Sequence, residues 1–210
     1  QSVGFYGPGG IPFAYPPVGI YLMAFFTSIL HIPPMIYLRF APPLFMWLSL
    51  IPVFLSTKEI SHSKTTGIVA SILIASSQQI FYVQATSAGI VRGLAFLFAW
   101  WGITFFLRAA NRDKKHLYAA FAGLFFGLTF LTHLSYAVFA VLFVVSYVIV
   151  NISKKEAWLP ALEAGVAAIL VVTPWVLTMV QRYGWVVFMN ASQTHGAGRF
   201  LLVFSQPEKF

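Results

Sequence analysis

Long apolar runs, close to the length that crosses a lipid bilayer as a helix, constrain this chain of 210 residues more than any other feature. Hydrophobic residues make up 59% of it and charged residues only 9%, which is too little polar surface to cover a water-soluble core. The sequence therefore predicts an all-α, polytopic transmembrane bundle with about six spanning helices. The expected spans are residues 35–55, 66–81, 91–107, 117–131, 136–150 and 159–180.

A shorter apolar run, residues 18–30, lies between the pairs Pro16-Pro17 and Pro33-Pro34. It is too short to cross the hydrocarbon core unaided, so we expect an interfacial or re-entrant helix there. Proline suits the first turn of a helix, where its missing N–H would lack a partner anyway. We expect Pro17 to start this helix at a fixed angle. The helix then either forms one wall of a ligand site or merely anchors the loop.

The charged loops predict how the chain is oriented. Lysines and arginines gather in alternate loops, after residues 55, 107 and 150, and the positive-inside rule makes those loops cytoplasmic. Three regions follow: residues 1–34 close an extracytoplasmic loop and carry the interfacial helix, 35–180 form the transmembrane bundle, and 181–210 begin another extracytoplasmic loop. Because no signal peptide is visible and the chain begins at Gln1, we expect a fragment of a longer protein.

Several cations are expected at the outer ends of the spans: Arg39, Arg92, His133 and Arg182. A cation at membrane depth is costly and usually has a partner, so their convergence would suit an anion such as a lipid phosphate. Alternatively, the arginines extend to the interface and His133 bonds a neighbouring helix. Both interpretations stay open at this point.

Other chemistry is sparse in this sequence. The net charge is +8, but the basic residues lie in short loops between apolar runs, so nucleic acid is not an expected partner. The absence of cysteine excludes disulfides and thiolate chemistry. The predicted topology puts four of the five carboxylates at the cytoplasmic side, and no spacing indicates a metal site or an acid pair for catalysis.

Four segments carry a resemblance to a known group of enzymes. They are YPPVGIYLMAFF (15–26), QATSAGIVRGLAFLFAWWGITFFLRAANRD (84–113), GLFFGLTFLTHLSYAVF (123–139) and TPWVLTMVQRYG (173–184). In this order they resemble loops and spans of the polyprenyl-phosphate-sugar-dependent glycosyltransferases of the GT-C superfamily. That superfamily includes protein O-mannosyltransferases and aminoarabinose transferases.

The resemblance implies an integral membrane glycosyltransferase of the cell envelope, in a bacterial or archaeal plasma membrane, with an outward-facing active site. It implies inverting transfer from a polyprenyl-phosphate sugar to a protein or lipid acceptor, with a general base upstream of Gln1. His133 stands where the family has a lysine, and a second-loop acid is not evident between Gln84 and Arg92. The resemblance therefore does not imply a particular cofactor, and a divalent metal stays an open alternative. The candidate substrate-binding residues are Arg92, His133, Arg39, Arg182, Tyr15 and Pro17.

A transporter or flippase of lipid-linked or small polar substrates is the alternative from another class. It would also use intramembrane arginines and broken helices, although we find no inverted repeat in these spans. A purely structural membrane subunit is the third interpretation.

Overall fold

The computed structural model describes residues 2–3, 11–12, 15–85, 89–111, 115–186 and 188. Two short strands, β1 (Ser2–Val3) and β2 (Ile11–Pro12), pair antiparallel. All other elements in the described ranges are helices, which confirms the predicted helical class. They are α1 (Val18–Ser28), α2 (Pro34–Ser61), α3 (Lys64–Ser76), α4 (Gln78–Ala85), α5 (Gly89–Asn111), α6 (Lys115–Phe130), α7 (Leu134–Val150) and α8 (Lys155–Tyr183). The chain divides into two units, residues 16–172 and residues 1–15 with 173–210.

Three of the described helices, α2, α5 and α8, are long and apolar enough to cross a membrane, and a fourth span results if α3 and α4 are counted together. α6 and α7 have 16 and 17 residues, somewhat less than the about 20 that a span needs. The integral membrane class is therefore supported, whereas the expected count of about six spans is not confirmed.

The segment expected to span the membrane over residues 66–81 is broken into two helices. α3 ends at Ser76, α4 begins at Gln78, and their axes are bent by 66°. The backbone of Ser77 is extended (φ −74°, ψ 100°), and its hydroxyl accepts a hydrogen bond from the N–H of Ile80 at 3.4 Å. Ser77 thus caps the start of α4, because a serine side chain supplies the acceptor that a new helix needs.

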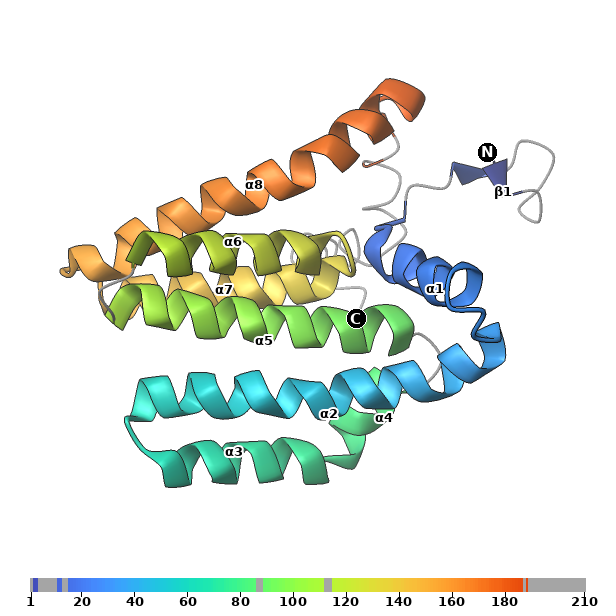
Figure 1. Cartoon of the computed structure of the whole chain (residues 1–210). Coiled ribbons are helices and arrows are strands. Elements are labelled where there is room, and N and C mark those ends of the chain that lie inside the picture. Colours follow the sequence, from blue (N-terminus) through green and yellow to red (C-terminus); the bar gives the residue numbers. More distant parts are fainter. Residues whose placement is uncertain are drawn as a thin grey trace, which may run out of the picture. The chain divides into compact units, whose positions relative to one another are not determined.

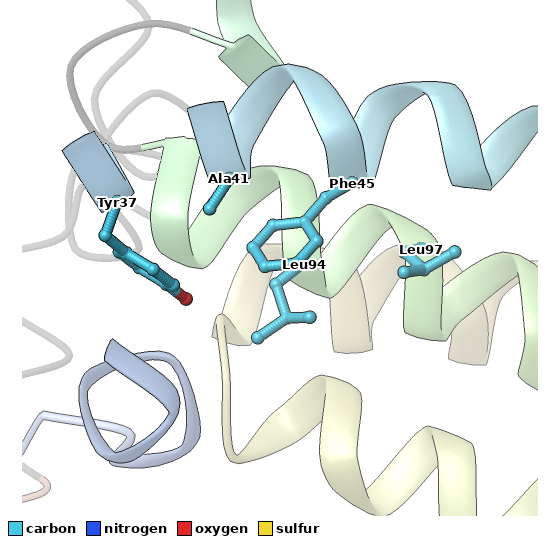
Figure 2. Close-up of a cluster of buried hydrophobic side chains, with 5 residues drawn as sticks. All are labelled: Tyr37, Ala41, Phe45, Leu94 and Leu97. Carbon is cyan, nitrogen blue, oxygen red and sulfur yellow. The ribbon is translucent and has the colours of Figure 1, made fainter. Parts of the chain in front are cut away.

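Helix α5 forms the centre of the unit 16–172, and in Figure 1 it lies between α2 and α6. About two thirds of the most apolar stretch of α5 is buried, compared with about one third of that of α2. Tyr37, Ala41 and Phe45 of α2 pack onto Leu94 and Leu97 of α5 (Figure 2). A second buried cluster joins the other half of α5 to α6 and α8. Packing on both sides therefore fixes where each end of α5 lies.

The helices from α5 to α8 alternate in direction (Figure 1). The end of α5, the start of α6 and the start of α8 consequently meet at one end of the bundle. The other end of the bundle is formed by the start of α5, the end of α6 and the start of α7. The length of α5 separates the two ends by about 30 Å.

Candidate functional site

A polar cluster forms where α4 ends and where α5 and α7 begin. The Gln84 side-chain amide donates a hydrogen bond to the Tyr136 hydroxyl. The rings of His133 and Tyr136 meet edge to face, with centroids 5.6 Å apart and planes at 70°. The guanidinium of Arg92 lies close enough to Tyr136 to act on it electrostatically. We call Gln84, Arg92, His133 and Tyr136 the Tyr136 cluster.

Two glycines let α4 come close enough to α5 to place Gln84. A Cβ added at Gly93 would lie 2.9 Å from the Gln84 carbonyl oxygen, and Gly89 makes a similarly close approach to that oxygen. The Gln84 side chain is almost fully buried, with its residue 4% exposed. Its Oε1 has no hydrogen-bond partner in the described part of the chain.

The turn between α6 and α7 places His133 and Tyr136. His133 is the N-cap of α7 with an extended backbone (φ −160°, ψ 118°), and its N–H donates to the Thr129 carbonyl at 2.8 Å. Its own carbonyl accepts from the Tyr136 N–H at 3.2 Å. The two residues are three apart in the first turn of a helix, which brings their side chains to the same side.

The start of α1 lies against the residues that adjoin this cluster. The Val18 N–H donates to the Leu131 carbonyl at 3.0 Å, two residues before His133. A Cβ added at Gly19 would lie 2.7 Å from Val91 Cγ1, next to Arg92. The expected helix over 18–30 is confirmed as α1, with Pro17 as its N-cap. The structure therefore brings Pro17 alongside the cluster.

The candidate residues of the unit 16–172 do not all converge. The His133 ring contacts Tyr136, Arg92 acts on Tyr136 electrostatically, and Pro17 directly precedes Val18, which bonds Leu131. Arg39 is exposed on α2, where its guanidinium lies 5.7 Å from the centroid of the Phe40 ring, and no contact in the described residues joins it to the cluster. Tyr15 and Arg182 are exposed and belong to the other unit.

Sequence reasoning did not select Gln84 and Tyr136 as site residues. The signal for Tyr136 was its spacing of three from His133, which puts both on one helical face. Gln84 gave a weaker signal, because its burial depends on the bend after Ser77 and on the close approach of α4 to α5.

The opposite end of the bundle holds a cluster of a different kind, formed by Lys115 and His116 of α6 with Glu156 and Glu163 of α8. Lys115 Nζ lies 3.9 Å from Glu156 Oε1, and His116 Nδ1 lies 2.9 Å from Glu163 Oε1. A cavity of about 170 Å³ lies between Lys115 and the two glutamates. We call these four residues the acid–base cluster.

Carboxylates distinguish the two ends. Those that the structure describes are Glu59 in the last part of α2 and Glu156 and Glu163 in the first part of α8, all away from the Tyr136 cluster. No group of three His, Asp or Glu side chains in the described ranges could hold a metal ion. The Tyr136 cluster thus offers a fixed positive charge and neutral hydrogen-bonding groups, which suit an anion.

The fold defines a helical integral membrane protein. Residues 14–177 match the family model described as dolichyl-phosphate-mannose-protein mannosyltransferase, so the chain belongs to that family. A search of curated proteins and a search of solved structures each gave no match. Membership confirms the resemblance to the GT-C glycosyltransferases and favours a membrane glycosyltransferase over a transporter or flippase.

Proposed function

We propose that this chain transfers a sugar from a polyprenyl-phosphate carrier to a protein or lipid acceptor, and that it holds the carrier phosphate at the Tyr136 cluster. One observation carries the proposal: the His133 ring contacts Tyr136, and Arg92 acts on Tyr136 electrostatically, at an end of the bundle where the described residues include no carboxylate. The family description names a dolichyl-phosphate-linked sugar, which supports a lipid-phosphate donor.

In this mechanism the bond between the anomeric carbon and the phosphate oxygen breaks while the acceptor oxygen forms a new bond to that carbon. Negative charge grows on the departing phosphate. Arg92 stabilises that charge, since a guanidinium stays protonated and presents several donors in fixed positions. His133 adds a hydrogen bond. The acceptor proton passes to a general base outside this cluster, as the resemblance implies, and direct displacement inverts the anomeric carbon.

The helix α1 forms one wall of this site. Its support is the hydrogen bond from Val18 to Leu131 and the close approach of Gly19 to Val91, which join α1 to the segments carrying His133 and Arg92. Pro17 sets the direction of the chain at this point. The positive-inside rule supports an extracytoplasmic position for the site, because Lys58, Arg108 and Lys115 lie at the other end.

The test measures sugar transfer from a panel of polyprenyl-phosphate sugars by the intact protein in lipid nanodiscs. We expect Arg92→Ala to lower transfer by about 100-fold, as removal of one charge-stabilising donor does in other active sites. His133→Ala should have a smaller effect in the same direction. Arg108→Ala is the matched control, an arginine at the other end of the same helix, and should retain transfer.

Transfer at the wild-type level in folded Arg92→Ala protein would overturn the assigned phosphate site. If folded wild-type protein transferred none of the sugars but moved a lipid-linked sugar across the bilayer, the transporter alternative would replace the proposal.

A further inference from the structure

Gln84 is a polar side chain in a place where an apolar one would be expected. It lies in the last turn of α4, with its residue only 4% exposed, among helices that bury apolar side chains. Its Oε1 has no hydrogen-bond partner among the described residues, and its amide nitrogen donates to Tyr136. Burying a polar group without satisfying it costs free energy, so packing alone does not account for glutamine here.

The direction of this hydrogen bond decides what Tyr136 can do. A phenol has one proton to donate and an oxygen that accepts. Because that oxygen already accepts from the Gln84 amide, the phenolic proton is free to point to another acceptor. The Tyr136 ring is also held by neighbouring rings, with the Phe96 centroid 6.0 Å away and the His133 centroid 5.6 Å away. The position of the hydroxyl is therefore well defined.

We infer that Gln84 is a positioning residue that aims the Tyr136 hydroxyl proton at a phosphate oxygen held by Arg92. The inference rests on the proposed function and deepens it. A hydrogen bond to an ionised acceptor strengthens as the acceptor gains charge. A lipid-linked sugar phosphate carries one negative charge, whereas the phosphate monoester that it leaves behind carries nearly two. Tyr136 therefore binds the departing carrier phosphate more strongly than the bound donor, which favours cleavage of the glycosidic bond.

The test measures binding of two probes, farnesyl phosphate and farnesol, to the intact protein in nanodiscs. The first carries a phosphate monoester, and the second has the same isoprenoid chain without it. The variants are Gln84→Met, which keeps the side-chain length but removes the amide, Tyr136→Phe, which removes only the hydroxyl, their combination, and Arg92→Ala.

We expect Gln84→Met and Tyr136→Phe each to weaken farnesyl phosphate binding about tenfold, the size of one hydrogen bond to a charged group. Farnesol binding should stay unchanged in both. The double variant should bind farnesyl phosphate no more weakly than Tyr136→Phe alone, because Gln84 acts through Tyr136. If Gln84 had a purely structural role, its replacement would weaken the binding of farnesyl phosphate and of farnesol together.

Equal loss of both probes would overturn the inference, and so would unchanged farnesyl phosphate binding in Gln84→Met. Arg92→Ala could abolish the preference for farnesyl phosphate while Gln84→Met and Tyr136→Phe keep it. The inference would then be wrong, and the proposed function would stand. If the wild-type protein showed no preference for farnesyl phosphate over farnesol, the proposed function would fail together with the inference.

Discussion

The two ends of the helix bundle in residues 16–172 both gather polar residues, but they balance their charges differently. At the acid–base cluster each basic side chain faces a carboxylate, Glu156 for Lys115 and Glu163 for His116. At the Tyr136 cluster the described residues supply Arg92 and His133 without a carboxylate. Among the described residues, the first end pairs its basic groups with carboxylates, whereas the second supplies no carboxylate for Arg92, whose charge an anionic ligand would neutralise.

The difference teaches how to separate a structural polar cluster from a binding one. Ion pairs that are largely exposed add little stability, and a cluster of matched charges needs no ligand to account for it. A cation near a membrane-embedded helix, with a buried amide and a phenol beside it, does need an account. Family membership alone does not say which end of the bundle binds the carrier phosphate. The charge balance favours the end with the Tyr136 cluster.

The largest expected effect comes from placing an acid in the Tyr136 cluster. Gln84→Glu puts a carboxylate beside Tyr136, in the cluster that holds Arg92, and makes this end resemble the acid–base cluster. A unit charge about 8 Å from the phosphate costs on the order of 2 kcal/mol at an effective dielectric of 20, in addition to the lost amide hydrogen bond. We expect sugar transfer to fall by about 100-fold, well below that of Gln84→Met. Comparable transfer by the two variants would show that charge balance does not govern this end.

The second prediction separates the charge of Arg92 from its shape. Arg92→Lys keeps one positive charge but loses the planar, forked donors that match a phosphate. We expect transfer to fall about tenfold, between wild type and Arg92→Ala, with most of the loss in turnover because the forked donors meet the charge that develops. Steady-state kinetics at saturating donor measures this. A lysine variant as inactive as Arg92→Ala would contradict a role for the charge itself.

The structure confirms the sequence-based expectation of a helical membrane protein and of a helix starting beside Pro17. It also brings together Arg92 and His133, two of the residues chosen from their expected depth, although their role in binding stays a prediction. The break at Ser77 escaped detection because hydropathy averages over a run and does not register a single serine that caps a new helix. Gln84 was not chosen as a site residue because its burial depends on that bend and on glycines in α5, which a hydropathy pattern does not reveal.

The third prediction tests whether the acid–base cluster is only structural. Glu163→Gln removes the carboxylate that lies 2.9 Å from His116 Nδ1; the His116 side chain is 83% exposed and that of Glu163 29% exposed. Because solvent screens such a pair, we expect a loss of stability of about 0.5–1 kcal/mol and unchanged sugar transfer. Thermal unfolding in nanodiscs measures the first and the transfer assay the second. A fall in transfer without a change in unfolding would indicate that this end also has a functional role.

The smallest effect is expected for Lys115→Ala at the same end. Lys115 and Glu156 are 3.9 Å apart, with side chains 41% and 55% exposed, so the pair gains little Coulomb energy over its separate hydration. We expect a change in stability below about 0.5 kcal/mol and transfer equal to wild type. Lys154→Ala, which removes a nearby lysine that bonds Asn151 at 3.4 Å, controls for the general loss of one positive charge at this end of the bundle. If Lys115→Ala lowered transfer more than Arg92→Lys does, the two ends would have exchanged roles, because a cation with its own acid would then matter more than one left to meet a phosphate.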